Sequence, residues 1–260
     1  MKYAFHSYSD AFSIIYDRRW GRYASSRAPI LISFLENRFG FAPAETRVCD
    51  LCCGTGQLTY KLADHGYRVY AVDQSSGMIA LCRRNNQEFI DRGVVEVSQQ
   101  TAQEYHLPTP ADVTVALFDS LNHLPSLSDL EDTFRSAAAA TRPGGLFLFD
   151  MNTRLGLDRW NGIQVDESEA WLVLVRGVYS PEMPRAYTAV SGFVEDEGNW
   201  RRFSEVIYNT PFVLSEVQEA LESAGWTSVQ FFSPDHLSVI KDDPEKLGRV
   251  FIAATRREDS

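Results

Sequence analysis

The chain has 260 residues, of which 44% are hydrophobic and 23% charged, so it is long enough to bury a core without disulfides or a structural metal. Aspartate and glutamate total 35 against 25 lysines and arginines, which gives a formal net charge of -10. A charge of that sign repels nucleic-acid phosphates, and no basic run offsets it. We therefore expect no nucleic-acid partner.

The sequence also predicts neither export nor membrane insertion. Polar residues interrupt the first twelve positions, so the apolar core of a signal peptide is missing, and no apolar stretch approaches the roughly 18 residues of a membrane span. Of the four cysteines, Cys49, Cys52 and Cys53 are too close to pair readily, and no second Cys pair or His pair follows to complete a zinc site. These features predict a cytoplasmic protein with no bound metal and no membrane partner.

Two helices are expected first, between Ser9 and Phe39, because apolar residues recur at helical spacing while Gly21 and Pro29 interrupt the run. Strands then alternate with helices, which predicts a parallel, doubly wound sheet with right-handed crossovers. The expected strands are 47–52, 67–73, 94–97, 111–118 and 145–150, and the expected helices are 57–65, 76–91 and 127–141.

The alternation stops near residue 155. Three β-rich runs at 170–179, 186–194 and 200–208 follow one another without room for crossover helices, which predicts an antiparallel meander. A helix at 215–224 and strands at 228–232 and 249–254 then finish the main sheet. We therefore expect an α/β fold with a Rossmann-like, doubly wound, seven-stranded and mostly parallel sheet, and a small antiparallel β lobe inserted after strand five. The expected divisions are an N-terminal helical cap at 1–44, the cofactor-binding core at 45–155, the β lobe over the acceptor pocket at 156–212, and the C-terminal completion of the core sheet at 213–260.

The strongest chemical signal is the segment Asp50-Leu-Cys-Cys-Gly-Thr-Gly56 between the first core strand and its helix. Glycines let the backbone approach a ligand at a helix N-terminus, where N–H groups are available. Asp73 ends the next strand, near the spacing of about 20 residues at which an acid binds ribose hydroxyls. Together these residues indicate an adenosine ligand, although Asp73 would alternatively cap the next helix through the Ser75 or Ser76 amide.

Thr59 stands where a dinucleotide-binding turn has its third glycine, which counts against NAD, and the sequence lacks the P-loop lysine motif of ATP sites. An NAD-dependent oxidoreductase and a non-catalytic module that binds the cofactor without turnover remain as alternatives.

Three segments in order, 48–56, 69–78 and 141–150, closely resemble motifs of the class I S-adenosylmethionine-dependent methyltransferases. The resemblance covers about residues 45–155 and implies direct in-line methyl transfer from S-adenosylmethionine. It also implies that Asp50 and the glycine turn hold the methionine end of the cofactor while Asp73 holds the ribose hydroxyls. Two departures are Cys52, in place of a glycine, and Gln100 or Thr101, where an aspartate often meets the adenine. The remaining cofactor contacts implied are Cys53, Gly54, Gly56, Gln74, Met78, Thr101, Ala102 and Leu117.

The loop after the fourth core strand, residues 117–124, is expected to face the transferable methyl group, because ligands bind beyond the carboxyl ends of the strands. It resembles the loop of small-molecule methyltransferases and lacks the motif of enzymes that methylate nucleobase or glutamine amino groups. His123 is a candidate base, since an unperturbed pKa of about 6.5 suits proton acceptance, or else a packing residue. Asp119 and Asn122 are candidates to bind the acceptor, or else ordinary turn residues.

Aromatic residues supply the last candidates. Tyr16 lies in a segment that resembles the helix closing over the cofactor in related enzymes, and we assign it a catalytic hydroxyl, with plain packing as the alternative. Trp160 and Trp171 are expected either to enclose the acceptor or to fill a small second core. The sequence thus predicts methylation of a small molecule, first at an amine nitrogen and second at a carboxylate or hydroxyl oxygen, and leaves the oligomeric state open.

Overall fold

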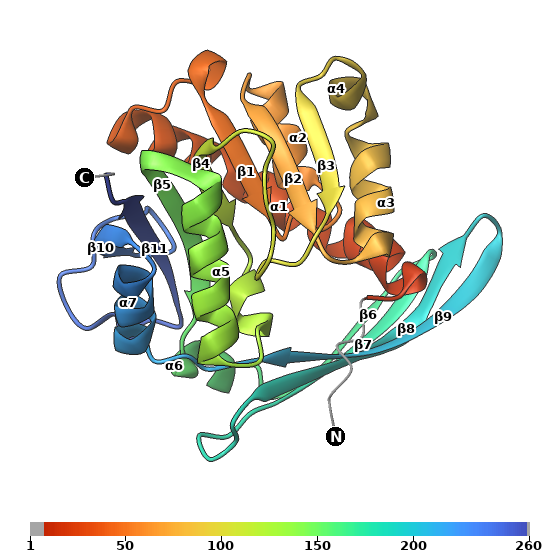
Figure 1. Cartoon of the computed structure of the whole chain (residues 1–260). Helices are drawn as coiled ribbons and strands as arrows, with labels where there is room; N and C mark the ends of the chain where they lie inside the picture. The colour runs from red at the N-terminus through yellow and green to blue at the C-terminus, as the bar shows by residue number, and fades with distance from the viewer. Residues whose placement is uncertain (1–7, 259–260) are drawn as a thin grey trace.

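A computed structural model describes residues 8–258, apart from the side chains of residues 22 and 23. Its centre is a seven-stranded sheet in the order β10-β11-β5-β4-β1-β2-β3, in which β11 alone runs opposite to the other six strands (Figure 1). This confirms the predicted doubly wound, mostly parallel sheet. Its strands are β1 (Arg47–Leu51), β2 (Arg68–Asp73), β3 (Val95–Gln99), β4 (Ala111–Ala116), β5 (Thr141–Asn152), β10 (Trp226–Phe232) and β11 (Arg249–Arg256).

Helices cover both faces of this sheet (Figure 1). On one face α1 (Asp10–Phe39) and α2 (Gln57–Asp64) bury Leu35 and Leu62 against the strands, beside α3 (Ser76–Asn85). On the other face α5 (Leu127–Ala140) and α7 (Leu214–Ser223) pack on Phe147 and Phe149 of β5. Central strands are therefore apolar on both sides, as parallel sheets require. The short elements are α4 (Gln87–Asp91), α6 (Arg154–Asp158), and the 3₁₀ turns η1 (Pro43–Glu45), η2 (Ser120–His123) and η3 (Pro244–Lys246).

The prediction of two helices before the first strand is wrong, because α1 is a single helix of 30 residues. Ser9 begins it by accepting a hydrogen bond from the Phe12 N–H, and Gly40 ends it with a φ of 75°. Gly21 does not interrupt the helix, since a Cβ there would lie 2.7 Å from the Gln57 amide and the glycine allows α1 to approach α2 closely. Tertiary packing thus outweighs the low helix propensity of Gly21 and Pro29.

The predicted helix at 76–91 is divided into α3 and α4 at Asn86. The buried Asn86 amide donates hydrogen bonds to the Cys82 carbonyl at 2.9 Å and to the Gly56 carbonyl at 3.1 Å. An asparagine that binds nearby backbone groups competes with helix continuation, which explains the break. The same contact joins α3 to the glycine turn after β1.

The predicted meander is confirmed and has one strand more than the three predicted runs. β6 (Gly162–Glu167), β7 (Trp171–Val178), β8 (Ala186–Asp196) and β9 (Asn199–Asn209) form a four-stranded antiparallel sheet that extends away from the core (Figure 1). We call this sheet the β lobe. Side chains from its inner face, among them Val173, Val190 and Phe203, pack on Phe12 and Ile15 at the start of α1. β6 was missed because nearly all of its residues are exposed and carry little core pattern.

Within the described part of the chain, no helix is long and apolar enough to cross a membrane. The same residues contain no group of three or more His, Cys, Asp or Glu side chains placed to hold a metal ion. All four cysteines are free thiols.

Candidate active site

A cavity of about 900 Å³ lies at the carboxyl ends of β1, β2 and β4. Its wall includes Asp50, Asp73 and Leu117 from the core sheet, Tyr16 from α1 and Thr188 from the β lobe. The chain leaves β1 toward β2 on one side and reaches β4 on the other, so the cavity lies at the topological switch point of the sheet. Doubly wound sheets bind their ligands there.

The turn after β1 takes an unusual backbone course. Cys52, Gly54 and Gly56 have φ values of 59°, 56° and 83°. Gly54 lines the cavity, whereas a Cβ on Gly56 would lie 2.6 Å from the Cys82 sulfur, so the structure assigns Gly56 to packing against α3 rather than to the cavity wall. Cys52, which replaces a glycine of the motif, holds a left-handed conformation that costs a non-glycine residue about 1 kcal/mol or more. The substitution therefore matters through backbone strain rather than through volume.

Asp50 is a buried carboxylate on the cavity wall and accepts a hydrogen bond of 2.6 Å from the Thr59 hydroxyl. Burial raises the pKa of Asp50 to about 7, while the Thr59 hydrogen bond acts in the opposite direction. A buried carboxylate of this kind is stabilised in its ionised form by a cationic partner. The α-ammonium of S-adenosylmethionine would supply that charge. Thr59, which departs from the dinucleotide-binding pattern, thus donates a hydrogen bond to Asp50, a role that the sequence did not predict.

Asp73 holds the glycine turn and the start of α3 at the same time. Its carboxylate accepts the Gly54 N–H and the Ser75 N–H, each at 2.9 Å. Asp73 can therefore cap α3 and still bind a ligand in the cavity, because each carboxylate oxygen has a second lone pair. Burial raises the pKa of Asp73, and these N–H groups lower it. The remaining lone pairs suit the two hydroxyls of a ribose.

An apolar part of the cavity lies beside Asp73. Met78, Ala102 and Leu117 line it and are nearly fully buried, and Gln74 and Thr101 complete the wall. The Gln100 amide is already bonded to the Ser98 hydroxyl and the His106 carbonyl, so Thr101 is the better candidate for an adenine contact. Two buried carboxylates, Asp50 and Asp73, and an apolar wall together suit an adenosine with a cationic tail.

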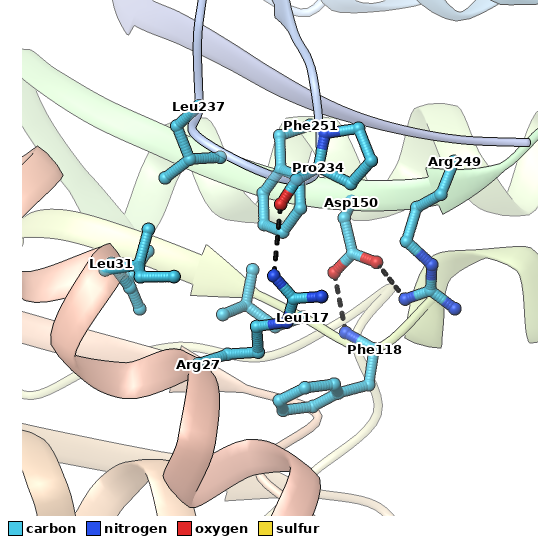
Figure 2. Close-up of a pocket in the computed structure, with 10 residues that line it drawn as sticks. Arg27, Leu31, Leu117, Phe118, Asp150, Pro234, Leu237, Arg249 and Phe251 are labelled. Carbon is cyan, nitrogen blue, oxygen red and sulfur yellow. Dashed lines mark hydrogen bonds and ion pairs between the residues drawn. The ribbon is translucent and has the colours of Figure 1, made fainter. Parts of the chain in front are cut away.

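The loop after β4 contains a second strained turn. Phe118 and Asp119 have φ values of 64° and 50°, and such non-glycine conformations cost on the order of 1–3 kcal/mol each. The buried Asp150 carboxylate holds this turn by accepting the Phe118 N–H at 2.6 Å (Figure 2). It also accepts the Asp119 N–H at 3.2 Å. Strain that the surroundings maintain in this way is typical of functional sites.

Arg249 completes the network around Asp119. Its guanidinium donates to both Asp150 and Asp119, at 2.5 Å for Asp119, while the Asn209 amide donates to the other Asp119 oxygen at 3.2 Å. Asp119 thereby lies on the cavity wall with a fixed orientation. Sequence reasoning missed Asp150, Arg249 and Asn209 because they join Asp119 only through the folded sheet. The one available signal was that Asp150 ends a core strand.

His123 and Tyr16 both line the cavity. His123 Nδ1 lies 3.0 Å from the Tyr208 carbonyl, which can only accept, so Nδ1 carries a proton, and in the uncharged tautomer with this proton Nε2 is the acceptor. Burial raises the pKa of Tyr16 well above its ordinary value, and the charges of Asp119 and Asp73 add to the shift. Tyr16 therefore stays protonated and is a hydroxyl donor rather than a base.

Helix α1 is fixed over the glycine turn by a contact that the sequence did not predict. Asp17, the residue after Tyr16, accepts hydrogen bonds from the Gln57 amide at 2.5 Å and from the Asn85 amide at 2.8 Å. These bonds join α1 to the N-terminus of α2 and to the end of α3. The position of Tyr16 over the cavity follows from this anchoring.

Two predicted acceptor residues are not brought to the cavity. The fully buried Asn122 uses its amide to bind the Asn152 and Thr210 carbonyls and the Asn152 N–H, so it joins the η2 turn to the ends of β5 and β9. Trp171 packs with the apolar residues between the β lobe and α1. Trp160, by contrast, does line the cavity, as do Cys52 and Cys53.

Comparison with known families agrees with this geometry. The family model for a methyltransferase domain matches residues 48–145. The Bacillus subtilis protein YqeM, named as a methyltransferase, is 24% identical over 186 residues, which cover 71% of this chain and 74% of that protein. A ubiquinone biosynthesis O-methyltransferase of Xanthomonas euvesicatoria pv. vesicatoria is 28% identical over 151 residues, 55% of this chain and 60% of the relative.

Solved structures share the whole fold. An S-adenosylmethionine-dependent methyltransferase from Clostridium acetobutylicum superposes with a TM-score of 0.77 at 20% identity, covering 95% of this chain and 98% of the other. The sugar N-methyltransferase KedS8 from Streptoalloteichus superposes with a TM-score of 0.75 at 20% identity, covering 99% and 97%. The sheet, the switch-point cavity and the matched domain define a Rossmann-like methyltransferase. Residues 48–145 form a methyltransferase domain, the chain as a whole has the fold of S-adenosylmethionine-dependent methyltransferases, and the cofactor that these comparisons support is S-adenosylmethionine.

Proposed function

We propose that this enzyme transfers the methyl group of S-adenosylmethionine to an amine nitrogen of a small molecule. The observation that supports this proposal is the position of the Asp119 carboxylate. Its carboxylate is buried, held by Arg249 and Asn209, and placed on the cavity wall at the loop after β4. A carboxylate fixed at this position suits an acceptor that offers N–H groups or a positive charge.

The shape of the site favours a small acceptor. The β lobe and α1 both contribute to the cavity wall, so the acceptor must enter beneath them. The net charge of -10 also makes a nucleic-acid acceptor unfavourable. The KedS8 match agrees with an amine of a small molecule, and the ubiquinone O-methyltransferase match keeps oxygen as the second candidate.

In the proposed mechanism, the cofactor when bound supplies an electrophilic methyl group on a sulfonium sulfur. Asp50 would hold the cofactor's ammonium and Asp73 its ribose hydroxyls. The apolar wall of Met78, Ala102 and Leu117 would hold its adenine. Asp119 orients the acceptor by accepting an N–H hydrogen bond, so that the nitrogen lone pair points at the methyl carbon. Such orientation is worth up to ~7–11 kcal/mol of the barrier.

Methylation of an amine leaves a proton on the nitrogen, and we assign His123 the role of accepting it. With the cofactor bound, the nitrogen lone pair would form the new N–C bond, and the electron pair of the broken C–S bond would stay on sulfur. The methylated nitrogen is then positive and gives its proton to His123 Nε2, the ring atom that the Tyr208 contact leaves as an acceptor. Tyr16 stays protonated and donates a hydrogen bond from its hydroxyl to polar atoms of the cofactor or acceptor. Oxygen methylation is the second candidate because the same Nε2 would take the proton of a hydroxyl.

The test is methyl transfer to matched small amines and alcohols, with the methylated atom located by tandem mass spectrometry. We expect N-methyl products, and Asp119→Asn should raise the KM for the amine by about tenfold or more while leaving the affinity for S-adenosylhomocysteine unchanged. Asp196→Asn, on the β lobe, is the matched control and should change neither quantity. Products methylated only on oxygen, or an Asp119→Asn enzyme with an unchanged amine KM, would overturn the proposal.

A further inference from the structure

Where α6 meets the β lobe, the cavity wall carries two arginines. Arg159 directly follows α6, and Arg185 directly precedes β8. We propose that these two arginines bind an anionic group of the acceptor, a carboxylate or a phosphate, so that the acceptor is an amine that also carries an anion. This inference rests on the proposed amine methylation and narrows its substrate class.

One apolar cluster joins the two segments from which the arginines extend. Trp160 packs with Leu157, Tyr179 and Ala186, and the chain neighbours of Trp160 and Ala186 are Arg159 and Arg185. At Gly177 a Cβ would lie 2.1 Å from the Trp160 carbonyl oxygen, so only a glycine lets the α6 end approach β7 this closely. The corner is therefore a built feature of the fold rather than a chance meeting of two surface side chains.

The Asn161 side chain fixes this corner further. Its amide donates a hydrogen bond of 2.8 Å to the Tyr179 carbonyl and accepts one of 2.7 Å from the Tyr179 N–H. These two bonds lock the segment after α6 to the end of β7. The backbone from which Arg159 extends is thus held in place.

Arg185 is oriented by two neighbours. Its guanidinium donates a hydrogen bond of 3.2 Å to the His123 carbonyl and lies 4.9 Å from the centre of the Tyr208 ring. The side chain is half-buried, and burial lowers the pKa of Arg185, an effect that the charge of Asp129 partly offsets. A partly desolvated guanidinium of fixed orientation gains from an anionic ligand, and its planar fork suits carboxylate and phosphate oxygens.

Arg159 differs from the other arginines on the cavity wall. Arg19 pairs with Asp166 at 2.5 Å, and Arg249 is held between Asp119 and Asp150. Within residues 8–258, Arg159 makes no hydrogen bond or ion pair. Its charge is therefore open to a ligand in the cavity.

The cavity thus offers opposite charges to the two ends of an acceptor. Asp119 provides the carboxylate beside the methyl position, and Arg159 and Arg185 provide the cationic corner under the β lobe. The neutral side chains of Val175 and Thr188 also line the wall under the lobe. His123 connects the two ends, because it lines the cavity and its carbonyl accepts a hydrogen bond from Arg185. An acceptor with an amine at one end and an anion at the other matches this pattern.

The first test measures anion binding without any methyl transfer. Inorganic phosphate and malonate are titrated by calorimetry into the enzyme saturated with S-adenosylhomocysteine. We expect binding by at least one of them, and at least a tenfold loss of that affinity in the Arg159→Gln/Arg185→Gln double variant. Arg202→Gln, an exposed arginine on β9, is the control and should bind like the wild type. Unchanged affinity for S-adenosylhomocysteine in the double variant shows that the fold survives.

The second test compares acceptors that differ only in the anion. Ethanolamine, O-phosphoethanolamine and β-alanine are offered with S-adenosylmethionine, and kcat/KM is compared between enzymes. We expect kcat/KM for one of the two anionic amines to exceed that for ethanolamine by at least tenfold, and we expect the double variant to lose this difference. The amine with the higher kcat/KM identifies phosphate or carboxylate as the preferred anionic group.

The two tests separate this inference from the proposed function. If neither anion binds, or if binding is the same in the double variant, the anion site is wrong even when amines are methylated. If anion binding depends on the arginines but every methylated product carries its methyl on oxygen, the anion site stands and the amine assignment fails.

Discussion

The two ends of the cavity are built in different ways. The cofactor end uses residues close together in sequence, from the turn at Asp50 to Gly54 and from the end of β2 at Asp73. The acceptor end joins Asp119, Asp150, Asn209 and Arg249, which come from separate elements of the core and the β lobe. A local motif therefore defines the cofactor end, and long-range packing defines the acceptor end.

The largest effect is expected for a variant that disrupts the acceptor end of the cavity. Asp150→Ala leaves the Arg249 charge without one of its carboxylates and removes the acceptor of the Phe118 and Asp119 N–H groups. Removing one partner of a buried pair costs about 3–5 kcal/mol, so the free energy of unfolding in urea should fall by that amount. Asp196→Ala breaks the exposed pair with Arg201 and should cost less than about 1 kcal/mol. Equal losses in the two variants would show that the network does not hold the turn.

A second variant breaks the cofactor end. Asp73→Ala removes the carboxylate that we propose binds the ribose hydroxyls, so affinity for S-adenosylhomocysteine should fall by at least tenfold, or about 1.4 kcal/mol, as measured by calorimetry. Asp91→Ala, at the end of α4 and exposed, is the control and should leave the affinity unchanged. A normal affinity in Asp73→Ala would remove the ribose assignment.

The sequence predicts the cofactor end of the cavity better than the acceptor end. The alternation of strands and helices and the motif around Asp50 predict the core sheet and the cofactor end, because each depends on neighbours along the chain. Asn122 was predicted at the acceptor end, yet it is buried between η2, β5 and β9. Arg249 was not predicted at all, since only β11 pairing with β5 brings it beside Asp150. Contacts between distant segments leave no local pattern.

The helix errors have the same origin. Gly21 lies inside α1 because the Gln57 side chain fills the space beside it, and Asn86 divides α3 from α4 because it binds the Gly56 carbonyl. Both contacts join segments that are far apart in sequence. Local propensity alone therefore predicts a break at the wrong residue.

The pH dependence of cofactor binding sharpens the account of Asp50. Its folded-state pKa of about 7 lies above the ordinary value of an aspartate. Between these two pKa values the folded protein holds a proton that the unfolded chain has lost. The contribution of Asp50 to stability is therefore present at low pH and is lost as pH rises toward 7. Cofactor affinity should change in the opposite direction, because the cationic cofactor prefers the ionised carboxylate. We expect affinity for S-adenosylhomocysteine to fall about fivefold between pH 7 and pH 6.

Thr59→Val supplies the matched variant for that measurement. It removes the hydrogen bond that lowers the pKa of Asp50, so the midpoint of the affinity change should move to higher pH. An affinity that does not change with pH in either protein would contradict the role of Asp50.

The smallest effect concerns the strain at Cys52. Cys52→Gly relieves the left-handed backbone and should raise the free energy of unfolding by up to about 1 kcal/mol, with cofactor affinity unchanged. Cys52→Ala removes the sulfur but keeps the strain and should give no such gain. If Cys52→Ala stabilises the protein as much as Cys52→Gly, the sulfur rather than the backbone is responsible.

The most direct test of the central claim is a crystal structure of the enzyme with S-adenosylhomocysteine. The account predicts ribose hydroxyls within about 3 Å of the Asp73 carboxylate, the amino group beside Asp50, and the sulfur facing Asp119 and His123. A nucleoside bound elsewhere, or one whose sulfur points away from the loop after β4, would contradict it.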